Sequence, residues 1–210
     1  MNARALGVGL LEALFPPPCG GCEDVGREPF CRICTEALLP AQPFEIEGAQ
    51  AALACWAYGG PVARALRDLK YEGRWPLGRA LGAQMQLMLP QLPTVDVVVP
   101  VPLAPAALVA RGYNQARELA RGLSRPILPR ALLRRPGVTQ VGLTRQERLA
   151  NLRDAFEPGP EPVKDRSVLL VDDVVTTGAT AEAACRILLA AGANRVVVLA
   201  AAHTSSEPGT

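Results

Sequence analysis

The chain has 210 residues, of which 49% are hydrophobic, 4% aromatic and 20% charged, and its formal net charge is +2. This length and composition predict a globular protein with one sizeable core, and they exclude a polar low-complexity chain. No apolar run in the sequence approaches the roughly 20 residues of a membrane span, so we expect no membrane insertion.

Residues 2–14 predict a short amphipathic helix of a cytoplasmic protein. Glu12 interrupts the apolar run, and the PPPCGGC stretch that follows offers no small-residue cleavage site, which argues against a signal peptide. Prolines 16–18 end this helix. The chain contains six cysteines, and in an intracellular protein these indicate metal binding or burial rather than disulfides.

Four of the cysteines follow the spacing C-x2-C-x8-C-x2-C, at Cys19, Cys22, Cys31 and Cys34. A two-residue gap lets one tight turn aim both sulfurs at the same point, and two such turns complete a tetrahedron with Zn–S distances of about 2.3 Å. Four thiolates leave no open coordination position, so the spacing predicts a structural Zn²⁺ site. The alternative is that these cysteines are free or redox-active.

Beyond the cysteines, apolar runs alternate with helical periodicity. The predicted strands are residues 52–58, 95–103, 167–172 and 195–202, and the predicted helices are residues 61–71, 77–89, 111–124, 144–152 and 179–191. Residues 126–142 predict a further strand and a loop. Strands that alternate with helices indicate a parallel α/β sheet. We therefore divide the chain into an N-terminal helix and zinc ribbon, residues 1–44, and an α/β domain, residues 45–210.

The stretch VLLVDDVVTTGAT, residues 168–180, joins a buried strand to a helix through a polar turn. The turn residues Thr176, Thr177, Gly178, Ala179 and Thr180 can wrap a phosphate with their backbone N–H groups at the positive end of the helix. Asp172 and Asp173 would repel that phosphate unless they hold sugar hydroxyls and a hard cation such as Mg²⁺. A ribose 5-phosphate fits this pattern. The alternative is an aspartate that caps the helix.

Arginines concentrate in the middle of the chain. Between residues 111 and 153, ten arginines face only two acidic residues, a local charge of +8 that leaves −6 for the rest. This asymmetry indicates an anionic partner, and the alternative is a solvated arginine-rich surface. Arg117, Arg121 and Arg125 recur every fourth residue, which predicts one stripe on a helix that contacts single-stranded DNA. The aromatic side chains available for stacking on bases are Trp56, Tyr58, Tyr71, Trp75 and Tyr113.

VLLVDDVVTTGAT resembles the phosphoribosyl pyrophosphate (PRPP) motif of type I phosphoribosyltransferases along its whole length. Further blocks resemble the ComF family of competence-associated, phosphoribosyltransferase-like proteins. These blocks are the two cysteine pairs, AYGGPVARALRDLKYEGR, VVPVPL, RGYNQARELA and TRQERLANLRDAF. The resemblance implies a Rossmann-like parallel sheet of the type I phosphoribosyltransferase kind, with helices on both faces and a small N-terminal zinc ribbon.

The resemblance also implies roles for individual residues. Asp172 and Asp173 would form the catalytic pair, and residues 176–180 would bind PRPP together with Mg²⁺. Pro102 would lie in the loop that contacts pyrophosphate, and residues 139–148 would match the flexible loop that closes over the substrate. Arginine forks suit a diphosphate because each donates two hydrogen bonds at once. The candidates for this contact are Arg111, Arg145, Arg148 and Lys70.

Three functions follow from the resemblance and the residues. The first is a PRPP-binding protein of natural competence that assists uptake of single-stranded DNA into the cytoplasm with a helicase-like partner. The second is an active phosphoribosyltransferase of nucleotide or sugar metabolism with an unknown acceptor. The third is a zinc-ribbon module that binds single-stranded DNA and has a vestigial pocket. Phosphoribosyltransferases usually carry a hood over the nucleobase, and we find no sequence that predicts one here.

Overall fold

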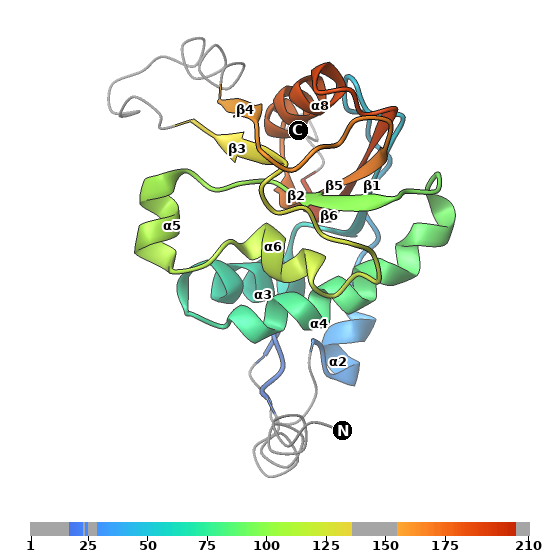
Figure 1. The fold of residues 1–210 in the computed structure, drawn as a ribbon. Coiled ribbons are helices and arrows are strands. Elements are labelled where there is room, and N and C mark those ends of the chain that lie inside the picture. The colour runs from blue at the N-terminus through green and yellow to red at the C-terminus, as the bar shows by residue number, and fades with distance from the viewer. Residues whose placement is uncertain (1–16, 23, 25–28, 136–154, 205–210) are drawn as a thin grey trace, which may run out of the picture.

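A computed structural model of the chain describes residues 17–22, 24, 29–135 and 155–204. The helices expected at residues 2–14 and 144–152 lie outside these described residues. The structure has a central sheet between two helical layers, and a short antiparallel hairpin beside it (Figure 1).

Four parallel strands form the central sheet in the order β1-β6-β5-β2. Their bounds are Ala51–Ala57 for β1, Arg195–His203 for β6, Ser167–Val175 for β5 and Val97–Pro100 for β2. The hairpin pairs β3 (Leu132–Arg134) with β4 (Phe156–Pro158). The parallel α/β architecture predicted from the sequence is therefore confirmed.

Helices cover both faces of the sheet. The described helices are α2 (Arg32–Glu36), α3 (Gly60–Tyr71), α4 (Trp75–Met85), the 3-10 helix η1 (Gln86–Gln91), α5 (Pro105–Arg111), α6 (Gln115–Ala120) and α8 (Ala179–Ala190). In Figure 1, α8 lies above the sheet, and α3, α4 and α6 lie below it. This two-sided cover explains why β5 and β6 are buried along almost their whole length.

Alternate residues of β5 enter two separate cores. Val168 and Leu170 pack on the α8 side, whereas Leu169 and Val171 pack on the side of α3, α4 and α6. All four side chains are fully buried. Because side chains alternate between the two faces of a strand, β5 contributes to both cores. Its two aspartates lie near its carboxyl end.

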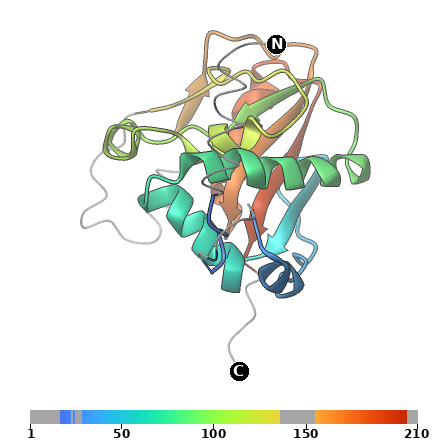
Figure 2. The ribbon, with the colours of Figure 1, turned by 90° about the horizontal axis from the view of Figure 1, so that it is seen from below.

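Glycine allows α6 to lie directly on α4, which crosses the strands in the view from below (Figure 2). A Cβ on Gly82 would lie 2.0 Å from the carbonyl oxygen of Leu119, and a Cβ on Gly78 would lie 2.6 Å from Glu118 Cβ. Neither distance is compatible with a side chain. This close approach positions α6, whose first residue is Gln115, below the end of β5.

Three predicted elements have other bounds in the structure. The expected helix at residues 111–124 is divided between α5 and α6, because Gly112 adopts a positive φ of +78° and Asn114 caps a new helix. The expected strand at residues 95–103 pairs over only four residues of β2. The expected strand at residues 167–172, by contrast, extends to Val175 and includes both aspartates.

Candidate functional site

The sulfur atoms of Cys19, Cys22, Cys31 and Cys34 form one cluster in which all four lie within 4.8 Å of one another. The Cys22 and Cys31 sulfurs are 3.7 Å apart, and the edge of a tetrahedron with Zn–S bonds of 2.3 Å measures about 3.8 Å. The backbone N–H groups of Gly21 and Cys31 donate hydrogen bonds to Cys19 Sγ, at 3.3 and 3.2 Å. The cluster therefore fits a tetrahedral metal ion, as its spacing predicts.

This cysteine cluster packs against α3 and β1. A Cβ on Gly21 would lie 2.7 Å from both Cys34 Sγ and Pro61 Cβ, so glycine is needed where the chain passes between the sulfur and the start of α3. The Phe30 ring meets Trp56 of β1 edge to face, with the ring centroids 5.7 Å apart. The cysteine region and the sheet are consequently joined by close contacts.

One guanidinium joins the segment ahead of the cysteines to the corner between α3 and α4. Arg74 Nη2 donates a hydrogen bond to the Pro18 carbonyl at 2.6 Å, and its Nη1 donates to the buried Asp68 carboxylate at 2.9 Å. Asp68 precedes Lys70 by two residues on α3. The end of α3 that carries Lys70 is therefore also joined, through Asp68 and Arg74, to the segment ahead of the cysteines.

Asp172 and Asp173 are both buried near the carboxyl end of β5. The Lys70 ammonium, in the last turn of α3, forms an ion pair with Asp173 Oδ2. Gln115 donates its side-chain amide to Asp173 Oδ1 at 3.4 Å, and the Asp173 N–H donates to Asp172 Oδ1 at 2.8 Å. The carboxylate pair is thus held by a cation from α3, a side-chain amide from α6 and a backbone N–H of β5 itself.

The two aspartates differ in their electrostatic surroundings. Burial raises the pKa of Asp172 well above its usual range, and the charge of Asp173 raises this pKa further. Burial lowers the pKa of Arg134 on β3, and the nearby Asp172 carboxylate opposes that shift. A ligand that brings hydroxyl donors or a cation to Asp172 would favour its ionised form.

A chain of polar contacts connects Asp173 with the surface. Gln115 Oε1 accepts a hydrogen bond from Arg111 Nη1 at 2.5 Å. The Arg111 guanidinium lies over the Tyr71 ring, 5.4 Å from its centroid, a geometry typical of a cation–π contact. Asp173 is therefore connected through Gln115 to Arg111 and to the Tyr71 ring at the edge of the carboxylate site.

The loop between α5 and α6 is fixed by its own side chains. Asn114 Oδ1 accepts a hydrogen bond from the Arg117 N–H at 3.2 Å, and Asn114 Nδ2 donates to the Val101 carbonyl at 2.9 Å. The Tyr113 hydroxyl donates to the Leu69 carbonyl, next to Lys70 on α3. These bonds hold the start of α6, which includes Gln115, against α3 and against the segment that directly follows β2.

The turn after β5 leads directly into α8. Gly178 precedes the helix with a φ of +82°, a left-handed conformation that glycine adopts without strain. The 12-residue helix α8 presents unpaired N–H groups and the positive end of its dipole to this turn. Thr176 and Thr177 are exposed here and add hydroxyl donors. An anion such as phosphate fits this arrangement.

The structure assembles part of the predicted PRPP site. Asp172, Asp173 and residues 176–180 lie together at the end of β5. Pro102 directly follows Val101, whose N–H donates to the Val171 carbonyl at 2.9 Å, so the loop after β2 lies beside β5. Arg145, Arg148 and the predicted flexible loop lie outside the described residues.

The prediction that Arg117, Arg121 and Arg125 form one helical stripe is wrong. Helix α6 ends at Ala120, because the RGLSRP sequence contains a glycine and a proline that end it, and Arg125 lies beyond the helix. Arg121 forms an ion pair with the buried Glu118, at 2.6 Å. Contact of these three arginines with DNA stays a prediction. The helical stripe on which that prediction was based is not present.

Gln115, Asn114 and Arg134 belong to the carboxylate site but were not predicted. Gln115 and Asn114 lie within the RGYNQARELA block, which is the one sequence signal that could have identified them. Arg134 lies in a three-residue strand with no motif. Its proximity to Asp172 depends on how the hairpin packs, which no local pattern indicates.

Residues 102–208 match the family of phosphoribosyl transferase domains. The chain is 31% identical over 154 residues to Competence protein F of Haemophilus influenzae, an alignment that covers 67% of each protein. It is 34% identical over 154 residues to DNA utilization protein YhgH of Escherichia coli strain K12, covering 67% of this chain and 66% of that protein. The chain belongs to the ComF family.

Membership of the ComF family agrees with a phosphoribosyltransferase-type parallel sheet that carries a cluster of four cysteines near its N-terminus. The chain aligns with about two thirds of the length of these ComF relatives.

Among solved structures it is similar to glutamine PRPP amidotransferase from B. subtilis complexed with ADP and GMP. That similarity has 24% identity and a TM-score of 0.40, and it covers 61% of this chain and 26% of the amidotransferase. Within the described residues, the helices are too short or too polar to span a membrane.

Proposed function

We propose that this chain binds PRPP or a related ribose 5-phosphate and serves natural competence, where it assists the uptake of single-stranded DNA into the cytoplasm. One observation carries the proposal: the buried pair Asp172 and Asp173 lies directly ahead of the Gly178 turn and the start of α8. The phosphate would accept hydrogen bonds from the N–H groups of the turn. The ribose hydroxyls would donate hydrogen bonds to the carboxylates.

Lys70 and Arg111 are suited to the diphosphate of PRPP. Lys70 neutralises Asp173 in the ligand-free chain, and a ribose hydroxyl that donates to Asp173 would leave the ammonium available to a phosphate oxygen. Arg111 lies one side chain further out, through Gln115. Carboxylate oxygens are ligands that Mg²⁺ prefers, and this cation would neutralise part of the diphosphate charge. The residues therefore supply both the sugar contacts and the cations that PRPP requires.

The test is calorimetric titration of PRPP with Mg²⁺ into metal-loaded wild-type protein and into an Asp172→Asn/Asp173→Asn variant. Arg166→Gln, an exposed substitution ahead of β5, serves as the control. We expect saturable binding that the double variant loses and the control keeps. Absence of binding to folded wild-type protein would refute the proposal. Pyrophosphate release that depends on an added acceptor would identify the chain as an active phosphoribosyltransferase.

Direct binding of single-stranded DNA is a second candidate function. Tyr71 and Trp75, at the corner between α3 and α4, are 70% and 54% exposed. Arg111 lies over Tyr71. Exposed aromatic rings beside a cation can stack on bases and hold the backbone without sequence preference. These side chains support the DNA role better than the arginines after α6 do.

This DNA role is tested by titrating a fluorescent single-stranded oligonucleotide at 50 and 500 mM salt. We expect affinity to fall steeply with salt, since phosphate contacts release counterions. A Tyr71→Ala/Trp75→Ala variant should bind at least tenfold more weakly, whereas Leu87→Ala, an exposed apolar control on η1, should not. Equal binding at both salt concentrations would refute the role.

The remaining parts of the proposal concern the metal, the location and the partner. We propose that the four cysteines hold a structural Zn²⁺, because a closed set of four thiolates leaves no coordination position for a substrate. We also propose a cytoplasmic location and a helicase-like competence protein as partner. Co-purification of the helicase with this chain during DNA uptake would test the partner.

A further inference from the structure

One arginine side chain contacts residues of both candidate sites. Arg111 Nη1 donates a hydrogen bond to Gln115 Oε1 at 2.5 Å, and Gln115 in turn donates to Asp173 of the carboxylate pair. The same guanidinium lies over the Tyr71 ring, 5.4 Å from its centroid. Tyr71 is 70% exposed and belongs to the surface proposed for single-stranded DNA. Arg111 therefore lies between the proposed PRPP site and the proposed DNA surface.

Helix α5, which carries Arg111, is held weakly by the rest of the protein. None of its residues is buried, and Val109 is 86% exposed. Figure 1 shows α5 at the outer edge of the molecule. It ends at Gly112, whose φ of +78° is a conformation that glycine adopts without strain. A helix with few buried contacts shifts at low cost in free energy, so Arg111 can change partners without disturbing the core.

The two partners of Arg111 are, by contrast, held firmly. Gln115 is buried, and the hydrogen bonds of Asn114 to the Val101 carbonyl and from the Arg117 N–H fix the start of its helix. The Tyr113 hydroxyl donates to the Leu69 carbonyl, which lies two residues ahead of Tyr71 on α3. The partners thus keep their places, and the Arg111 guanidinium is the part that moves.

The guanidinium of Arg111 has one positive charge, and two anionic ligands would compete for it. Lys70, the other cation beside the carboxylate pair, is already paired with Asp173. An arginine fork donates two hydrogen bonds at once to a phosphate group, whether this group belongs to a diphosphate or to a DNA backbone. A guanidinium that turns inward to the diphosphate of PRPP leaves the Tyr71 ring. The DNA surface then loses the cation beside its exposed aromatic side chain.

We propose that PRPP and single-stranded DNA bind this chain antagonistically, because both ligands recruit Arg111. The inference rests on the proposed function, since PRPP must occupy the carboxylate site and DNA must contact Tyr71. In the ligand-free chain, Arg111 lies over Tyr71 and is available to a DNA phosphate. With PRPP bound, Arg111 contacts the diphosphate, and the affinity for DNA falls. DNA weakens PRPP binding by the same factor, because coupling between two binding sites is reciprocal.

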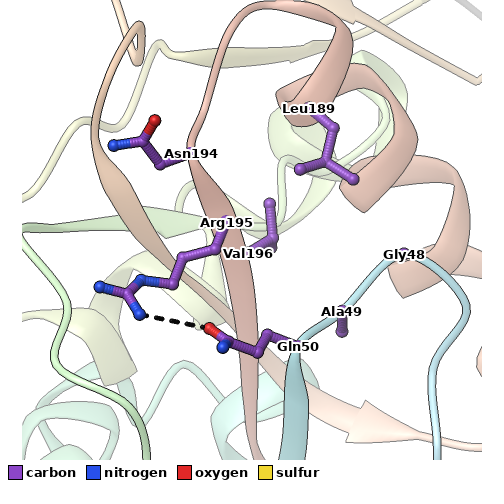
Figure 3. A pocket seen from close by; sticks show the side chains of 7 residues that line it. All are labelled: Gly48, Ala49, Gln50, Leu189, Asn194, Arg195 and Val196. Carbon is purple, nitrogen blue, oxygen red and sulfur yellow. Dashed lines mark hydrogen bonds between the residues drawn. The ribbon is translucent and has the colours of Figure 1, made fainter.

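A hollow of about 530 Å³ at the amino ends of β1 and β6 is not part of this connection (Figure 3). Figure 3 shows the Arg195 side chain directed at Gln50, and the distance from Arg195 Nη1 to Gln50 Oε1 is 3.4 Å. Arg195 Nε donates to Ser167 Oγ at 2.7 Å. Because this hollow lies at the opposite end of the strands from Asp173, a ligand bound there would not contact Arg111.

The experiment measures the affinity of a fluorescent single-stranded oligonucleotide for metal-loaded wild-type protein, with and without saturating PRPP, at matched ionic strength and free Mg²⁺. We expect PRPP to weaken oligonucleotide binding by about fivefold or more, the lower end of the usual coupling between two sites. Ribose 5-phosphate, which has no diphosphate, should change this affinity less than twofold. Calorimetric titration of PRPP with and without saturating oligonucleotide should give the same factor as the fluorescence titration.

Two arginine variants test whether Arg111 carries the coupling. In Arg111→Gln, each ligand alone should bind more weakly, and PRPP should change oligonucleotide affinity less than twofold. Arg166→Gln, which removes an exposed arginine ahead of β5, should keep the full effect of PRPP.

Unchanged oligonucleotide affinity in wild-type protein that calorimetry shows to be saturated with PRPP would overturn the inference and leave the proposed function intact. An effect of wild-type size in Arg111→Gln would also overturn it, because general repulsion between the two ligands would then be the cause. Failure of PRPP to bind would refute the proposed function, and failure of the oligonucleotide to bind would refute the DNA role. The inference would fail with either.

Discussion

Lys70 and Asp173 form an ion pair that joins the last turn of α3 to the carboxyl end of β5. The two residues are more than a hundred positions apart in sequence. Asp173 is buried and the Lys70 side chain is 24% exposed, so the cation lies between the carboxylate and solvent. This position lets one lysine stabilise the empty site and then contact a ligand phosphate.

Replacing Lys70 should separate these two roles. Lys70→Gln leaves a buried carboxylate without its cation, and breaking a buried pair in this way costs about 3–5 kcal/mol of folding free energy. In folded protein, we expect affinity for PRPP to fall at least tenfold, but affinity for ribose 5-phosphate, which has no diphosphate, to fall much less. Calorimetry with both ligands checks this, with Lys164→Gln as the exposed control. Equal losses for the two ligands would contradict a diphosphate contact.

Asp172 should make stability depend on pH. Burial, and then the charge of Asp173, make its pKa higher in the folded chain than in the unfolded chain. In the unfolded chain the pKa of aspartate is ~3.9. The protonated form therefore stabilises the fold at low pH, and this contribution is lost as pH rises through the raised pKa. We expect Asp172→Asn to melt above wild type at pH 8 and close to it at pH 5. Thermal melts across this range, with Asp165→Asn as control, check the trend, and a constant difference between the two proteins would contradict it.

The contact between α4 and α6 should not tolerate a side chain at Gly82. A methyl group there would overlap the Leu119 carbonyl, so Gly82→Ala should displace α6 and with it Gln115. Overpacking of this kind costs about 1–3 kcal/mol, which lowers Tm by about 2–4 °C per kcal/mol in a chain of this size. PRPP affinity should fall as well. Calorimetric melting of Gly82→Ala beside Gln84→Ala, an exposed control on α4, decides the matter. An unchanged Tm of Gly82→Ala would contradict this prediction, because it would mean that α6 can move away from α4 without loss of stability.

Metal removal should affect the carboxylate site through α3. The cysteine cluster contacts the start of this helix at Pro61, and Lys70 lies at its end. We expect Cys34→Ser to abolish stoichiometric zinc, to lower Tm by several degrees and to weaken PRPP binding. Metal analysis, melting and calorimetry on the same preparations check each step. Cys55→Ser, outside the cluster, should keep its zinc. Full PRPP affinity in zinc-free protein would show that the two sites are independent.

The parts of the site that the sequence predicted are the parts encoded locally. The cysteine spacing and the strand–turn–helix around Asp172 each fit within about twenty residues, so their geometry follows from turns and helix ends. The parallel sheet was equally predictable, since apolar runs alternate with helical periodicity.

The rest depends on contacts between distant segments. Lys70 and Gln115 meet at Asp173 only because the sheet order places β2 beside β5 and glycines bring α6 onto α4. The division of the helix at residues 111–124 was missed because the periodicity continues across Gly112. Phe44 lies in a segment without regular structure, and its stacking on His203 has no local signal.

A crystal structure of the metal-loaded protein with PRPP and Mg²⁺ is the most direct test of the central claim. The account predicts the 5′-phosphate within hydrogen-bond distance of backbone N–H groups of residues 177–180, with the ribose hydroxyls on Asp172 and Asp173. PRPP bound elsewhere, for example in the hollow beside Arg195 (Figure 3), would contradict it.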